Sequence, residues 1–181
     1  MIQGDIIISN PQTTIDSIFN RSVILLADHN KTGSTGFIIN KPLNIYLKEL
    51  IPEINIKFKI FFGGPVNKNN LFFIHNSSKL IPNSIEIDEN FHWGGDFEKV
   101  IELIKLNKLT SKDIRFFLGY SGWNINQLLE EQELNSWIIK DNIFKKKLLN
   151  IESENLWKNL IKSIGGDYLI WSNSPENPNL N

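Results

Sequence analysis

The segment Gly119-Tyr120-Ser121-Gly122-Trp123 carries the clearest chemical potential in the chain. It is close to the pattern G-x-S-x-G, in which a sharp turn between a strand and a helix exposes a serine nucleophile. The second glycine follows Ser121 directly, so the pattern fails by one position. A serine nucleophile also needs a histidine base. We keep Ser121 with His29 as an alternative function, a small-molecule enzyme of hydrolase type. The simpler interpretation is that the glycines shape a strained turn.

His29 lies between Asp28 and Asn30, where an imidazole beside a carboxylate could serve as a general base or a metal ligand. Metal sites usually collect three or four ligands at defined spacing. The other histidines, His75 and His92, are distant in sequence, and the chain contains no cysteine. The sequence therefore predicts no metal site and no thiol chemistry, and we expect histidines that make ordinary turn and surface contacts.

Two further glycine-containing segments could bind an anion through their backbone N–H groups. They are Gly33-Ser34-Thr35-Gly36 and Gly63-Gly64-Pro65-Val66. Neither contains the P-loop pattern, and the dinucleotide fingerprint G-x-G-x-x-G is absent from the chain. Tight turns are the default interpretation of both segments, and we predict no cofactor.

The composition is that of one globular domain with a sizeable core. Of the 181 residues, 41% are hydrophobic, and these include twelve Phe and five Trp. The net charge is −1, whereas domains that grip duplex DNA are usually basic. Direct nucleic-acid binding is therefore not expected. A nucleic-acid regulator would need a basic face built from Lys41, Lys57, Lys59 and Lys145 to Lys147.

The apolar runs of the chain are much shorter than the ~20 residues that span a bilayer. The first residues, Met1-Ile2-Gln3-Gly4-Asp5, lack the basic start and long apolar run of a signal peptide. We therefore expect a cytoplasmic protein without a membrane partner.

The elements that must position these residues follow from apolar periodicity and turn residues. Short apolar runs predict strands over 6–9, 22–27, 35–39, 57–62, 71–75, 84–87, 113–118 and 168–171. Helices are predicted over 96–106, 124–135 and 153–164, with a helical turn over 46–50; residues 137–140 fit a strand or a loop. Asp96 and Ser153 are the expected N-caps, and 22–27 with 35–39 should form an antiparallel hairpin.

Strands cluster early and helices late, without a regular β-α-β alternation. This order favours an α+β fold over a doubly wound parallel sheet. We predict a single domain over residues 1–171, followed by a flexible C-terminal tail over 172–181, where Asn, Pro and Ser dominate.

Taken in order and at their spacing, a set of residues along nearly the whole chain resembles the YqgE/AlgH family of bacterial proteins. The set comprises Gly4, Pro11, Phe19, Arg21-Ser22-Val23, His29-Asn30, Gly33, Gly36, Asn40-Lys41-Pro42, Gly63-Gly64-Pro65-Val66, His75, Gly119-Tyr120-Ser121-Gly122-Trp123, Gln127-Leu128, Glu131, Asn135 and Trp137. The chain departs from the family pattern at Leu129, where an acidic residue is usual, at Ile125-Asn126, and at Asp28.

The resemblance implies a compact α+β domain whose mostly antiparallel sheet is bent, partly closed like a barrel and surrounded by helices. It also implies a cytosolic protein with no established catalytic activity. One branch of the family has been linked to alginate synthesis, so its members are labelled transcriptional regulators. This chain shows no helix-turn-helix pattern with a basic recognition helix.

Our leading hypothesis is a non-enzymatic binding or regulatory module. Its partner would be an unidentified protein or a small anionic or planar ligand, because loop tryptophan, tyrosine and lysine side chains can grip such groups. The residues expected to line the site are His29, Asn30, Asn40, Lys41, Gly63, Gly64, Pro65, Tyr120, Ser121 and Trp123. The competing interpretation is that they only stabilise adjoining turns.

Overall fold

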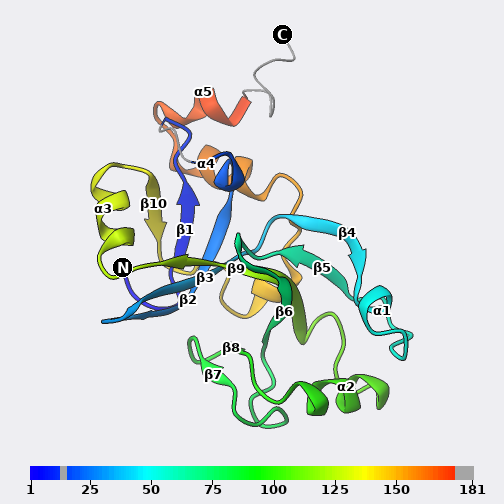
Figure 1. Cartoon of the computed structure of the whole chain (residues 1–181). Coiled ribbons are helices and arrows are strands. Elements are labelled where there is room, and N and C mark those ends of the chain that lie inside the picture. The colour runs from blue at the N-terminus through cyan, green and yellow to red at the C-terminus, as the bar shows by residue number, and fades with distance from the viewer. Residues whose placement is uncertain (13–15, 174–181) are drawn as a thin grey trace.

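The computed structural model describes residues 1–12 and 16–173, and Figure 1 shows strands at the centre with helices at the periphery. The strands are β1 (Ile6–Ser9), β2 (Val23–Asn30), β3 (Gly33–Ile38), β4 (Pro42–Tyr46), β5 (Lys59–Phe62), β6 (Val66–His75), β7 (Ile85–Glu86), β8 (His92–Trp93), β9 (Ile114–Trp123) and β10 (Trp137–Lys140). The α-helices are α1 (Leu47–Leu50), α2 (Phe97–Lys105), α3 (Gln127–Glu133), α4 (Leu156–Ile164) and α5 (Tyr168–Asn173). Two short 3-10 helices are η1 (Ser17–Phe19) and η2 (Lys145–Asn150).

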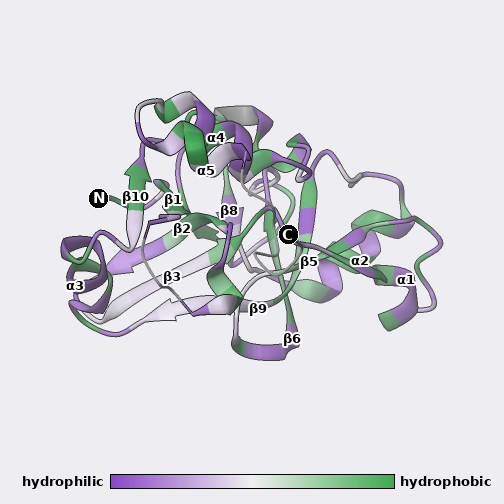
Figure 2. Cartoon of the chain, turned by 90° about the horizontal axis from the view of Figure 1, so that it is seen from above, coloured by the Kyte–Doolittle hydropathy of each residue, from purple (hydrophilic) through white to green (hydrophobic). Residues whose placement is uncertain are grey.

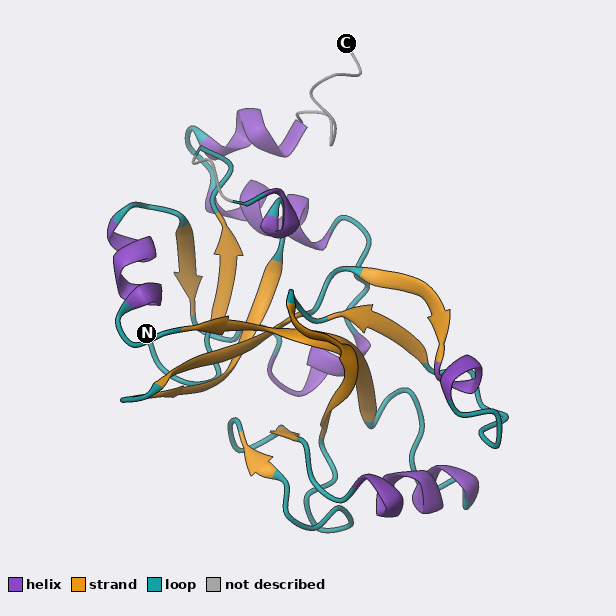
Figure 3. Ribbon diagram, viewed as in Figure 1, coloured by secondary structure: helices purple, strands orange, loops and turns teal. Residues whose placement is uncertain are grey.

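The strands form one bent sheet in the order β10-β1-β2-β3-β9-β6-β8-β7 (Figure 3). β9 is its centre, since it pairs with β3 and β6 antiparallel and with β5 parallel. β4 pairs with β5. This pair and the remaining strand pairs are antiparallel. The α+β fold with a mostly antiparallel sheet is confirmed. Within the described residues the sheet is not closed, because the path ends at β10 and β7.

Alternating side chains of the central strands enter different parts of the core, as the two-residue period of a strand requires. In β1, Ile6 and Ile8 pack in the cluster that α4 covers, whereas Ile7 packs on the opposite face with Trp123 and Trp137. A third cluster lies between α2 and strands β5, β6 and β9. The hydropathy colouring shows apolar residues along these strands (Figure 2).

Several predicted elements are confirmed. The hairpin of β2 and β3 is antiparallel, and the helical turn forms over 47–50. Residues 137–140, for which strand and loop were both open, form a strand. Helix α2 begins after Asp96, whose carboxylate accepts a hydrogen bond from the backbone N–H of Lys99 at 3.0 Å. These segments have the strongest periodicity or the clearest turn residues.

Several local predictions were wrong. Residues 168–171 belong to helix α5 instead of a strand, because a short apolar run does not distinguish the two by periodicity. The N-cap of α4 is Asn155, so the helix begins three residues later than expected and Ser153 does not cap it. The segment 119–123 continues β9, so it is not the strand–turn–helix of a nucleophile elbow.

Helix α5 extends to Asn173, and the remainder of the predicted tail, 174–181, lies outside the described residues. In the described part of the chain, no helix has the length and apolar character needed to cross a membrane.

Candidate functional site

The glycines of segment 63–66 allow two stretches of backbone to approach closely. A Cβ atom at Gly63 would collide with the carbonyl oxygen of Gly119, and one at Gly64 would collide with the backbone of Tyr120. Gly63 also donates its N–H to the Leu118 carbonyl at 2.8 Å. Gly63 and Gly64 therefore have a packing role, while Pro65 beside them is exposed.

Ser121 is fully buried, and its Oγ donates to the carbonyl of Gly63 at 3.1 Å. The Nδ1 of His29 is hydrogen-bonded to Ser34 Oγ at 2.8 Å. In the sheet, Ser121 pairs with Gly36, whereas His29 pairs with Ser34. The structure thus does not bring Ser121 and His29 into hydrogen-bond contact, and both hydroxyl and imidazole already have other partners.

Trp123 and Trp137 share one carboxylate. Their indole N–H groups donate to the same Oε2 atom of Glu131, at 3.0 and 2.7 Å, and Gln127 donates to the other oxygen at 2.8 Å. The ring of Phe19 lies against both tryptophans, with centroids 6.5 and 5.5 Å away. We call Trp123, Glu131 and Trp137 the indole clamp. It ties α3 to β9 and β10, so Trp123 is a buried structural residue.

His75 is fully buried, and both of its ring nitrogens have partners. Nδ1 accepts the backbone N–H of Ser77 at 3.1 Å, so Nε2 carries the proton and donates to the Gly94 carbonyl at 3.2 Å. Burial lowers the pKa of His75 to about 4. The ring is therefore neutral near pH 7, and the described residues contain no group of three His, Cys, Asp or Glu that could hold a metal ion.

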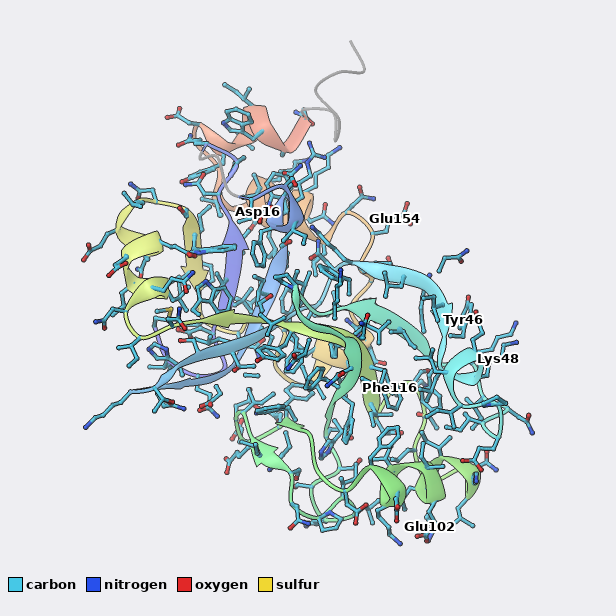
Figure 4. All side chains as sticks on the ribbon, viewed as in Figure 1. Asp16, Tyr46, Lys48, Glu102, Phe116 and Glu154 are labelled. Atoms are coloured by element: carbon cyan, nitrogen blue, oxygen red, sulfur yellow. The ribbon has the colours of Figure 1, made fainter. Side chains whose placement is uncertain are left out.

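A hollow of about 710 Å³ is lined mostly by polar and basic residues from four parts of the chain, residues 17–21, 40–42, 59 and 153–158. We call it the basic cleft. The charged residues on its walls are Arg21, Lys41, Lys59, Glu154 and Lys158. Figure 4 shows Glu154 on the loop that leads into α4. Four cationic side chains and one carboxylate make this cleft electropositive, although the whole chain has a net charge of −1.

Hydrogen bonds between side chains and the backbone position Arg21 and Lys41 at the cleft. Asn40 accepts the N–H of Val23 at 2.8 Å through Oδ1 and donates to the Arg21 carbonyl at 2.9 Å through Nδ2. Arg21 has a positive φ of 53°, and its guanidinium lies over the Trp157 ring, 5.2 Å from the centroid. Lys41 donates to the Ile18 carbonyl at 2.7 Å, and burial lowers its pKa.

The N-terminus of α4 adds to the positive potential of the basic cleft. Asn155 has a left-handed backbone (φ 59°) and makes no side-chain cap hydrogen bond. The first-turn residues Leu156, Trp157 and Lys158 line the cleft. The unpaired N–H groups of a first turn carry partial positive charge, which favours an anion.

The family assignment follows from comparison with known proteins. The model of a family described as AlgH-like matches residues 6–169. A protein of Cytophaga hutchinsonii named UPF0301 protein is 40% identical over the full length of both chains. One of Parabacteroides distasonis with the same name is 38% identical, covering 99% of this chain and 91% of that protein.

The chain belongs to the AlgH-like family. Two solved structures share its fold. The solution structure of the AlgH protein from Pseudomonas aeruginosa has a TM-score of 0.73 at 22% identity, covering 96% of this chain and 94% of that chain. The crystal structure of protein DIP2367 from Corynebacterium diphtheriae has a TM-score of 0.76 at 18% identity, covering 96% and 93%. The resemblance to the YqgE/AlgH family is confirmed.

In this AlgH-like chain the expected site residues do not form one site. Asn40 and Lys41 line the basic cleft. His29 and Asn30 line a separate hollow of about 300 Å³ at the turn that joins β2 to β3. Tyr120 packs on Phe72, with ring centroids 5.4 Å apart. Gly63 and Gly64 allow the close backbone contact, and Ser121 donates to the Gly63 carbonyl. Trp123 belongs to the indole clamp, and Pro65 is exposed.

Sequence reasoning missed Lys158, and it considered Lys59 only as part of a nucleic-acid face. Of that predicted face, Lys41 and Lys59 line the basic cleft, and Lys57 does not. The side chains of Lys145 and Lys146 lie outside the described residues. No local spacing could have found Lys158, because the cleft joins η1, β4, β5 and α4 from distant parts of the sequence.

Proposed function

We propose that this AlgH-like protein is a non-enzymatic binding module that recognises an anionic ligand in the basic cleft. One observation carries this proposal: Arg21, Lys41, Lys59 and Lys158 surround a single hollow, and Glu154 is the one carboxylate among its described lining residues. A chain of net charge −1 concentrates positive charge here. The volume of the basic cleft, about 710 Å³, lies within the range of roughly 300–1,000 Å³ that is typical of small-ligand pockets.

The chemistry of the walls favours phosphate or carboxylate groups. Guanidinium groups bind such anions in a bidentate manner, and lysine supplies a mobile point charge. Lys41 is partly desolvated, which strengthens its electrostatic attraction to a bound anion. The N-terminus of α4, which has no side-chain cap, adds to the attraction for an anion.

A regulatory role would follow from ligand binding. We place the protein in the cytoplasm, and any effect on transcription would be indirect, because the net charge disfavours a direct grip on duplex DNA. The hydrolase alternative lacks support, since Ser121 Oγ is buried and bonded to the Gly63 carbonyl.

The test is calorimetric titration of the full chain with inorganic pyrophosphate at low salt. We expect saturable binding, weakened at least fivefold by Lys158→Gln. Lys162→Gln is the matched control, because Lys162 lies one turn further along α4, is exposed and does not line the cleft. Absence of binding, or equal weakening by both variants, would contradict the proposal.

A further inference from the structure

A second hollow of about 240 Å³ adjoins the basic cleft, and we call it the side hollow. Lys59 lines both hollows. The segment that leads into α4 runs along both as well, since residues 149–152 line the side hollow and 153–158 line the basic cleft. Lys59 and the segment 149–158 thus form a border that the two hollows share.

The side hollow differs in chemistry from the basic cleft. Its apolar walls include Phe58, Phe61 and Ile114, while Ser111 and Asn150 offer hydrogen-bonding groups. At about 240 Å³ it falls below the ~300 Å³ of a complete small-ligand pocket. It suits one flat, mostly apolar part of a larger ligand with polar edges.

One cation of the side hollow is buried. Arg115 is 8% exposed, and its guanidinium lies over the Phe61 ring, 4.4 Å from the centroid. It donates to the carbonyls of Ile39 (3.1 Å), Leu149 (2.7 Å) and Ile151 (3.1 Å). None of its described partners is a carboxylate, so its positive charge is stabilised by carbonyl dipoles and by the Phe61 ring. Glu152 is the sole carboxylate among the described lining residues, and it is exposed.

We infer that the ligand is an organic phosphate of the nucleoside phosphate class, with its phosphates in the basic cleft and its planar ring in the side hollow. This inference rests on the proposed function. A bare anion would use only the basic cleft. A ring with hydrogen-bonding edges matches the apolar walls with Ser111 and Asn150 at the side hollow. Lys59, between the two spaces, neutralises the phosphate that joins them.

The experiment compares ADP, GDP and UDP with inorganic pyrophosphate by calorimetry on the full chain at the same low salt. We expect at least one nucleoside diphosphate to bind about tenfold more tightly than pyrophosphate. Ser111→Phe fills the side hollow from an exposed position and should remove this advantage while leaving pyrophosphate binding unchanged. Ser78→Phe, at an exposed serine that lines neither hollow, is the control.

The outcomes separate the two proposals. If pyrophosphate binds and no nucleoside diphosphate binds more tightly, the inference is overturned and the proposed function stands. The same holds if Ser111→Phe and Ser78→Phe act alike. If neither pyrophosphate nor any nucleoside diphosphate binds, both are overturned. Chemical-shift changes of the amides of residues 149–152 with a nucleoside diphosphate, absent with pyrophosphate, would support the inference.

Discussion

At the scale of single residues, the polar groups that first attract chemical interest are mostly engaged in the fold. Ser121 donates to a carbonyl, and the imidazole of His75 is bonded at both nitrogens. A neutral, buried histidine costs stability only when it must accept a proton. The contribution of His75 can therefore be measured as a change in the free energy of unfolding with pH.

For His75 we expect a loss of stability on acidification. Burial lowers its pKa from 6.5 to about 4 in the folded state. The unfolded chain therefore binds more protons between these values, and the free energy of unfolding falls as pH drops from about 6.5 to 4. We expect His75 to contribute roughly 1–2 kcal/mol to this fall, after allowance for solvent screening.

The measurement is urea denaturation of the wild type and His75→Gln at pH 7, 5.5 and 4.5. Glutamine keeps a donor and an acceptor but does not titrate, so the variant should show a smaller change over this range. If the free energy of unfolding changes with pH by the same amount in the wild type and in His75→Gln, His75 does not contribute to the loss of stability on acidification.

At the scale of elements, the indole clamp explains the spacing of Trp123, Glu131 and Trp137 along this chain. Glu131 faces inward from α3 and joins the tryptophans of β9 and β10 through one oxygen atom. A sequence pattern of two tryptophans around a helical glutamate is thus a packing device. It accounts for the spacing of residues 123, 131 and 137 without a ligand.

Glu131→Ala should destabilise the fold substantially. It leaves the indole N–H groups of Trp123 and Trp137 without their acceptor, and each unsatisfied buried donor costs about 1–3 kcal/mol. We expect a drop of about 2–4 kcal/mol in the free energy of unfolding. The neighbouring Glu133→Ala, on the exposed side of α3, should stay within ~0.5 kcal/mol. Denaturant melts followed by tryptophan fluorescence would measure both, and equal effects would refute the clamp.

At the scale of the whole molecule, sequence patterns predicted the class of fold and most elements. Residues 6–9 and 97–105 have local signals that tertiary contacts reinforce. The conformation of residues 168–171 was not predictable, because tertiary context decides between helix and strand for so short a run. The candidate site was only partly predictable. Asn40 and Lys41 mark the basic cleft, but Lys59 and Lys158 reach it only through the path of the sheet and the placement of α4.

At the basic cleft, we expect residues that favour ligand binding to lower the stability of the unliganded protein. Lys158 allows this expectation to be measured. This lysine lies in the first turn of α4, where the helix dipole disfavours a cation by about 0.3–1 kcal/mol. It also faces the other cations of the cleft. Lys158→Gln should therefore raise the unfolding temperature of the unliganded protein slightly.

With pyrophosphate present, the order should reverse. A ligand that binds only the folded state stabilises it by about 2.7 kcal/mol at a hundred times its dissociation constant. The wild type should gain more of this stabilisation than Lys158→Gln, so their melting curves should cross as pyrophosphate is added. Lys162→Gln removes a cation from the last turn of α4, where the dipole favours it, so it should melt slightly lower and keep the full gain. If Lys158→Gln melts lower than the wild type without ligand and gains as much from pyrophosphate, Lys158 stabilises the fold and does not bind the anion. A lysine that binds the anion should instead lower the stability of the unliganded protein, because it lies among other cations at a helix N-terminus.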